Sequence, residues 1–185
     1  MPVMISMLRG VNVGGHNQVK MDALRKLYES LNLRDAQTYV QSGNVVFKTT
    51  ERNPSVVAKK IADAIEKTFG FRTDVVLRTS AQLKNAIAKN PFAKRKAGDP
   101  SKLLVTFLAE EPESKLTNSV LSKKNGPEEL RISGRELYIY FPNGMGRTKL
   151  NWLAVVKTLG TTGTGRNLNS VMKLLEIAER LEASE

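Results

Sequence analysis

The chain has 185 residues, of which 41% are hydrophobic and 25% charged, and this balance is typical of a globular protein and excludes a disordered or collagen-like chain. It contains 29 lysines and arginines against 18 aspartates and glutamates, which gives a net charge of +11. It has no cysteine and one histidine, so disulfides, thiolate catalysis, cysteine-ligated zinc, iron–sulfur clusters and histidine-rich metal sites are excluded.

We expect no targeting signal in the first residues. Residues 3–8 are apolar, but this is only the length of a strand, and they run into Arg9 without a preceding basic segment. Elsewhere no stretch approaches the roughly 18 apolar residues that a membrane span requires. We therefore expect a cytoplasmic protein without a membrane partner.

The first 90 residues alternate between strand and helix patterns. Asn53 followed by Pro54 is a helix-start signal. In chain order the predicted segments are a strand 3–8, a glycine-rich loop 10–18, a helix 21–31, strands 37–41 and 45–47, a helix 54–69, a strand 73–77 and a helix from Ser80. The order βαββαβ is that of the ferredoxin-like split unit.

A break follows the third helix. Asn90-Pro91 ends that helix, and the next segment contains the basic run Lys94-Arg95-Lys96 and the turn-forming run Gly98-Asp99-Pro100. The basic run is either a nucleic-acid contact or a solvated linker. We predict a basic linker over residues 91–101, between a first half of residues 1–90 and a second half of residues 102–185.

The second half repeats the first in outline. The predicted segments are a strand 102–108, a helix 112–124, a hairpin 130–141 that turns at Gly134, a helix 150–159, a loop or brief edge strand 160–165 and a final helix that carries Leu168. The fold class predicted is therefore α+β, with two ferredoxin-like halves that arose by internal duplication.

The first of three polar loops runs from Arg9 to Asn17, and Lys20 leads from it into a helix. Glycines in such a loop allow backbone N–H groups to approach a ligand, and the following helix N-terminus favours an anion. The loop lacks the Gly-Lys-Ser/Thr of a P-loop. A plain glycine-rich connection is the alternative interpretation.

The other two loops also combine glycine with cations. In residues 143–149, Thr148 is a predicted helix N-cap, and the flanking Arg147 and Lys149 are unfavourable at that helix end unless an anion binds there. The alternative is an Asn-Gly turn with solvated charges. Residues 162–167 lack dinucleotide-binding spacing, but Arg166 can hold a phosphate or carboxylate through two hydrogen bonds.

Several segments carry a resemblance to a known family. They are residues 7–15, 20–21, 39–47, 142–144, 147–150 and 164–167. Together they resemble an uncharacterised bacterial family known as domain of unknown function 1697, DUF1697. The resemblance implies a cytoplasmic bacterial protein of two ferredoxin-like halves, with no established activity. The family usually has Trp where this chain has Leu168, and often Ser where it has Thr148, which keeps the hydroxyl.

The segments that carry the resemblance coincide with the polar loops and with residues 41–44, which suggests a shared polar site. The candidate anion-binding residues are Arg9, Asn12, Gly14, Gly15, His16, Lys20, Asn44, Arg147, Thr148, Lys149, Arg166 and Asn167. No catalytic residue and no cofactor is identified. The only metal compatible with this composition is an oxygen-ligated Mg²⁺ carried by a phosphate, so no protein metal site is expected.

Three functions fit these observations. The first is an anion-binding protein whose ligand is a nucleotide or a nucleic-acid backbone, because excess lysine and arginine neutralise phosphates. The second is a small enzyme acting on a phosphorylated or carboxylated metabolite, in which arginines hold the anion and His16 or Lys20 transfers a proton. The third is an interaction module without a ligand. The sequence indicates no particular oligomeric state.

Overall fold

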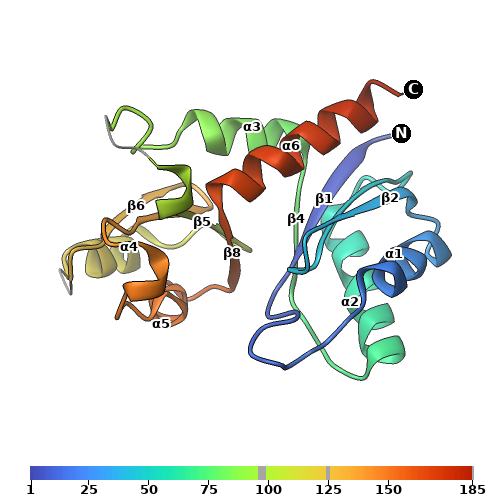
Figure 1. The fold of residues 1–185 in the computed structure, drawn as a ribbon, viewed down its shortest axis with the longest axis horizontal. Coiled ribbons are helices and arrows are strands. Elements are labelled where there is room, and N and C mark those ends of the chain that lie inside the picture. The colour runs from blue at the N-terminus through green and yellow to red at the C-terminus, as the bar shows by residue number, and fades with distance from the viewer. Residues whose placement is uncertain (96–98, 124–125, 185) are drawn as a thin grey trace. The chain divides into compact units, whose positions relative to one another are not determined.

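The computed structural model describes residues 1–95, 99–123 and 126–184, and within them it shows a mixed α+β fold with two four-stranded antiparallel sheets and six α-helices (Figure 1). Internal contacts divide the chain into two compact units. The first unit is Met1–Lys84 together with the chain from Lys173 onward, and the second is Asn85–Met172. The division into residues 1–90, 91–101 and 102–185 stays a prediction, and its Lys96 and Gly98 lie outside the described residues.

The sheet of the first unit has the strand order β2-β3-β1-β4, with each neighbouring pair antiparallel. Its strands are β1 (Val3–Leu8), β2 (Arg34–Tyr39), β3 (Asn44–Lys48) and β4 (Val75–Arg78). The helices along this part of the chain are α1 (Met21–Ser30), α2 (Pro54–Phe69) and α3 (Ser80–Ala88). The predicted order of elements is therefore present.

The core of the first unit lies between one face of this sheet and helices α1 and α2. Leu8 and Phe47 of the sheet and Ile61 of α2 are buried in one apolar cluster. Within this cluster Tyr28 of α1 places its hydroxyl 2.8 Å from the Ser6 hydroxyl, which gives both buried oxygens a hydrogen-bond partner. This packing holds α1 against the sheet, and the preceding loop ends where α1 begins.

The C-terminal part of α6 (Leu168–Glu182) belongs to the first unit, where it runs beside the first residues of α3, which belong to the same unit (Figure 1). The Ser80 hydroxyl donates to Glu182 Oε1 at 2.5 Å, and Lys84 forms an ion pair with Glu179 at 3.5 Å. These polar contacts, made by residues distant in sequence, join the two ends of the unit.

The sheet of the second unit has the corresponding order β6-β7-β5-β8, again antiparallel throughout. Its strands are β5 (Leu103–Leu108), β6 (Glu129–Ser133), β7 (Glu136–Tyr140) and β8 (Gly163–Asn167). Helices α4 (Ser114–Leu121) and α5 (Trp152–Thr158) contribute Val120 and Val156 to the cluster that covers one face. Two short 3₁₀ helices, Pro100–Lys102 and Met145–Arg147, precede β5 and α5.

Several boundaries differ from the sequence predictions. The strand predicted at 37–41 is Arg34–Tyr39, because the register with β3 shifts between Arg34 and Gln37 and Val40 leaves the extended conformation with a φ of 49°. The strand predicted at 73–77 is Val75–Arg78. The helix predicted at 112–124 is Ser114–Leu121, and Lys124 lies outside the described residues.

The segment 162–167 was grouped with the polar loops, and residues 160–165 were also considered as a brief edge strand; in the structure, Gly163–Asn167 form the edge strand β8. It pairs with β5 at one edge of the sheet, with Gly165 opposite Thr106. A Cβ on Gly163 would lie 2.8 Å from the Phe107 carbonyl oxygen, so this glycine permits close strand packing. No helix in the described part of the chain is long and apolar enough to cross a membrane.

Candidate functional site

A hollow of about 440 Å³ in the first unit lies against the loop that joins β1 to α1. It is lined by Asn12, Gly15, Gln18, Val19, Lys20 and Gln41. Three of these residues, Asn12, Gly15 and Lys20, are candidates named from the sequence. The glycine-rich loop and the turn after β2 therefore contribute to one site, although they are far apart in the chain.

Asn12 connects the two segments of the chain that line this hollow. Its Nδ2 donates to the carbonyl oxygens of Val19 at 3.0 Å and Gln41 at 2.8 Å, while its Oδ1 accepts from the Val19 N–H at 2.8 Å. The residue has a φ of 55°, a left-handed conformation that asparagine tolerates better than most residues. Both amide hydrogens of Asn12 are used in this way, so it positions the loop rather than donating to a ligand.

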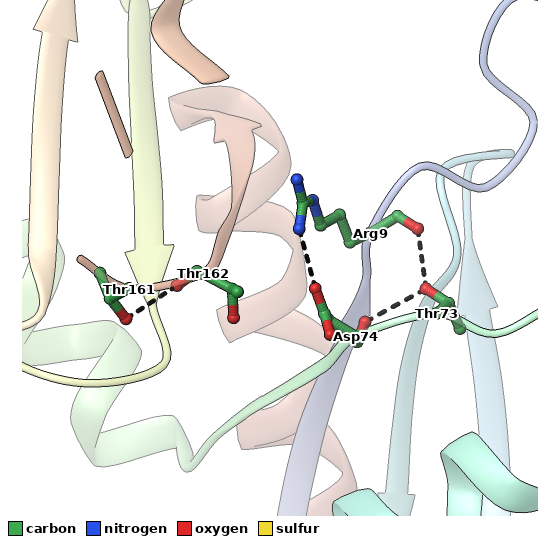
Figure 2. Close-up of polar contacts among 5 residues, drawn as sticks. All are labelled: Arg9, Thr73, Asp74, Thr161 and Thr162. Carbon is green, nitrogen blue, oxygen red and sulfur yellow. Dashed lines mark hydrogen bonds and ion pairs between the residues drawn. The ribbon is translucent and has the colours of Figure 1, made fainter. Parts of the chain in front are cut away.

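Arg9 is engaged at the base of the same loop. Its Nη1 donates to Asp74 Oδ2 at 2.9 Å, and its carbonyl oxygen accepts from the Thr73 hydroxyl at 2.7 Å, as Figure 2 shows. Both ion-pair partners are nearly half exposed. Arg9 does not line the hollow, and its charge is offset by Asp74, so its role is to fix the end of β1 against the start of β4.

The groups with free hydrogen-bonding capacity lie in the middle of the loop and at its end. Gly14, Gly15 and His16 are exposed, and both glycines have a positive φ. Lys20 is the N-cap residue of α1 but makes no side-chain capping bond, and the residue is exposed. No residue within the described ranges forms an ion pair with Lys20. The hollow is therefore lined by a lysine that forms no ion pair with a described residue and by a glycine with a positive φ.

Two polar lining residues, Gln18 and Gln41, were not among the candidates. Both side chains are exposed, and their amides can donate to or accept from a ligand. The only sequence signal for Gln41 was its place in segment 41–44. Asn44 from that segment is instead fully buried, with its Nδ2 donating to the Tyr39 carbonyl oxygen at 3.1 Å, and it does not line the hollow.

The second predicted loop lies in the second unit and is built differently from the prediction. Thr148 is not the helix N-cap: that residue is Asn151, whose Oδ1 accepts from the Ala154 N–H at 3.0 Å. The prediction failed because a 3₁₀ helix precedes this point and α5 begins only at Trp152. The Thr148 hydroxyl donates to Glu128 Oε1 at 2.5 Å instead. Arg147 is exposed, and Lys149 lines a separate hollow.

Arg166 and Asn167 are held within the second unit by their own neighbours. Arg166 is 7% exposed, and its Nη1 donates to Thr164 Oγ1 at 2.6 Å and to the Gly165 carbonyl oxygen at 2.9 Å. Burial lowers the pKa of the Arg166 guanidinium to about 10, because the charged form loses its hydration. Asn167 donates to the Ser101 carbonyl oxygen at 2.9 Å. These contacts support strand β8.

The structure thus divides the twelve candidates between the two units. Arg9, Asn12, Gly14, Gly15, His16, Lys20 and Asn44 lie in the first unit, and Arg147, Thr148, Lys149, Arg166 and Asn167 lie in the second. Among the described residues, no group of three or more histidine, aspartate or glutamate side chains is placed to bind a metal.

The family model described as "Protein of unknown function (DUF1697)" matches residues 1–138, which is more than half of the chain. The chain belongs to the DUF1697 family. A solved structure with the same fold is that of conserved bacterial protein SP0830 from Streptococcus pneumoniae, with a TM-score of 0.74 and 19% sequence identity over 96% of this chain and 98% of that one. No curated protein matches this DUF1697 chain.

Proposed function

We propose that this DUF1697 protein is a cytoplasmic protein that binds the phosphate of a nucleotide or of a nucleic-acid backbone in the hollow of the first unit. The observation that carries the proposal is that the Lys20 side chain and the exposed Gly15 line the same hollow. A lysine ammonium is a compact point charge with three donors, which suits a phosphate. Glycine allows a phosphate oxygen to approach the backbone N–H.

The surroundings of Lys20 support a ligand of this kind. The side-chain amides of Gln18 and Gln41 lie in the lining and can hydrogen-bond a sugar or a base edge. A volume of about 440 Å³ falls in the usual range of small-molecule sites. The hydrogen bonds of Asn12 hold the two sides of the hollow in place before the ligand arrives, which reduces the entropy lost on binding.

We further propose that the chain consists of two ferredoxin-like halves that arose by duplication and are joined through residues 91–101. The matching strand orders of the two sheets support it. So does a shared feature of the fourth strands, where Arg78 lies opposite Ile5 and Arg166 lies opposite Val105, each pairing with the third residue of the central strand. Both arginines are buried.

Calorimetric titration of ATP and of a short single-stranded oligonucleotide tests the binding proposal. We expect saturable binding that Lys20→Ala weakens about tenfold or more, because a charge-assisted hydrogen bond is lost. Lys26→Ala is the matched control, since this exposed lysine lies on the same helix but not in the hollow. Equal effects of the two substitutions, or no binding by either probe, would refute the proposal.

The salt dependence of the same titrations separates the two ligand classes. Oligonucleotide affinity should fall steeply between about 50 mM and about 200 mM salt, and Lys20→Ala should reduce the slope of log K against log salt by about one. Affinity for a nucleotide held in the hollow should change much less. If only the oligonucleotide binds and Lys20 leaves the slope unchanged, the phosphate contacts lie elsewhere on the surface.

A second candidate function, an enzyme acting on a phosphorylated metabolite, is favoured by the place of His16. Its imidazole is exposed and follows directly on Gly15, which lines the hollow. A histidine beside a bound phosphate can act as a general acid or base. In this case His16→Asn would abolish turnover of the substrate and leave its affinity within about twofold, whereas for a binding protein neither quantity would depend on His16.

A further inference from the structure

We propose that the second unit contains a separate site for a small carboxylate with an apolar body, such as a medium-chain acyl carboxylate. A hollow of about 300 Å³ lies beside α4, β6 and α5. Its lining combines an apolar wall with two lysine side chains, Lys123 and Lys149. This proposal concerns residues outside the phosphate site and stands independently of it.

The wall of this hollow is formed by aliphatic side chains from three elements and the turn before α5. They are Val120, Leu130, Leu150, Ala154 and Val155. Leu130, Leu150 and Val155 are only partly buried, and they pack against the core cluster of the second unit. A hydrocarbon chain in this hollow would cover apolar surface that is in contact with water, which favours binding.

The charged part of the lining favours an anion. Neither Lys123 nor Lys149 forms an ion pair with any residue that the structure describes. The lining also contains one carboxylate, Glu128, but its Oε1 already accepts the short hydrogen bond from Thr148. Two cations against one hydrogen-bonded carboxylate leave a net positive charge beside the apolar wall, which complements a monoanion.

The polar groups next to the lysines fit a carboxylate head group. Asn151 uses its Oδ1 to cap α5, which leaves its Nδ2 as a donor in the lining. Thr158, on the far turn of α5, uses its hydroxyl to donate to the Ala154 carbonyl oxygen at 2.9 Å. Among the described side chains of the lining, Lys123, Lys149 and Asn151 are the available donors, and the remainder is mostly aliphatic. The hydroxyl groups of a sugar-phosphate would form few hydrogen bonds with that apolar wall.

Titration with octanoate, octanol and octylamine, followed by calorimetry, tests this site. Octanoate should bind saturably, and the alcohol and the amine should bind at least tenfold more weakly, because they lack the negative charge. Lys149→Ala should weaken octanoate binding about five- to tenfold. Lys157→Ala is the matched control, since it removes an exposed lysine of α5 that does not line the hollow, and it should change the affinity less than twofold.

Two further variants test the apolar wall and the independence of the two sites. Ala154→Leu adds bulk to the lining at an exposed helix position, so it should weaken octanoate binding without lowering the melting temperature. Lys20→Ala should leave octanoate affinity unchanged. The carboxylate site and the phosphate site can therefore be refuted separately. No saturable octanoate binding, equal binding of octanol, or insensitivity to both Lys149→Ala and Ala154→Leu would overturn the proposal.

Discussion

The side-chain amide of Asn12 donates a hydrogen bond to the main-chain oxygen of Gln41 at 2.8 Å. This bond joins the glycine-rich loop before α1 to the turn that follows β2. Because the same amide also donates to the Val19 carbonyl oxygen at 3.0 Å, one side chain connects both ends of the loop with the turn. The lining of the first hollow therefore depends on Asn12 as a support.

Substitution of Asn12 tests this role. Asn12→Gly keeps the left-handed backbone conformation but removes the side-chain hydrogen bonds, and it should lower the free energy of unfolding by about 2 kcal/mol. Asn12→Ala should cost about 1 kcal/mol more, because alanine is strained at a positive φ. Urea denaturation measures both values. Wild-type stability in both variants would show that the hydrogen bonds of Asn12 do not hold the loop.

Val40 is strained in the turn that carries Gln41. It is a β-branched residue with a φ of 49°, and it is 47% exposed. Val40→Asn should raise the free energy of unfolding by about 1 kcal/mol, because asparagine tolerates this conformation. Val56→Asn is the matched control: Val56 is 49% exposed on α2 without a positive φ, so its substitution should be nearly neutral. If Val40→Asn and Val56→Asn changed the free energy of unfolding equally, the backbone of Val40 would not be strained.

The conformation of Val40 also shows why part of the fold was not predictable. The start of α2 was predicted correctly, because Asn53 and Pro54 are a local signal and Asn53 does cap the Ser55 N–H. The end of β2 depends instead on a left-handed valine, which no pattern of residue types indicates. Strand β8 was obscured by Gly163 and Gly165, which are typical of loops, although Gly163 is required here by the close approach of the β5 backbone.

The two central strands differ at matching positions, and this difference is testable. Ser6 of β1 shares a hydrogen bond with Tyr28, whereas the Thr106 hydroxyl of β5 is buried and has no hydrogen-bond partner among the described residues. Thr106→Val should therefore raise the free energy of unfolding by about 1 kcal/mol, while Ser6→Ala should lower it by about 1 kcal/mol. A destabilising Thr106→Val would mean that the hydroxyl has a partner, such as a buried water.

Stability should fall as the pH rises above about 10. Burial raises the pKa of the Tyr28 and Tyr138 hydroxyls well above their ordinary value of about 10, so above that pH only the unfolded chain loses these protons. Arg166 acts in the opposite direction, because its pKa is lowered to about 10 and the native state releases that proton first. Because the two tyrosines lower the free energy of unfolding in this pH range and the one arginine raises it, the protein should become less stable overall.

Urea denaturation at several pH values between about 8 and about 11.5 measures this dependence. Tyr28→Phe should make the alkaline loss of stability shallower, although it also removes the hydrogen bond to Ser6 and lowers stability at neutral pH. Stability that is constant up to pH 11.5 would contradict the burial of both hydroxyls.

The candidate site was predictable only in part. Glycine spacing and Lys20 identified the loop before α1, because such loops depend on local sequence. The contribution of Gln41 depends on the pairing of β2 with β3, which brings a distant turn to the loop. Arg9, Arg166 and Asn44 were chosen because their side chains can bind an anion. In the structure Arg9 forms an ion pair with Asp74, and Arg166 and Asn44 are buried. Only the tertiary structure shows these contacts.

The most direct measurement of the phosphate site is an NMR titration of the ¹⁵N-labelled protein with pyrophosphate. The proposal predicts saturable shifts of the backbone amides of Gly14, Gly15 and Lys20, together with the Gln41 side chain, and loss of these shifts in Lys20→Ala. Shifts that are absent, that do not saturate, or that persist in Lys20→Ala would contradict binding of phosphate in the hollow of the first unit.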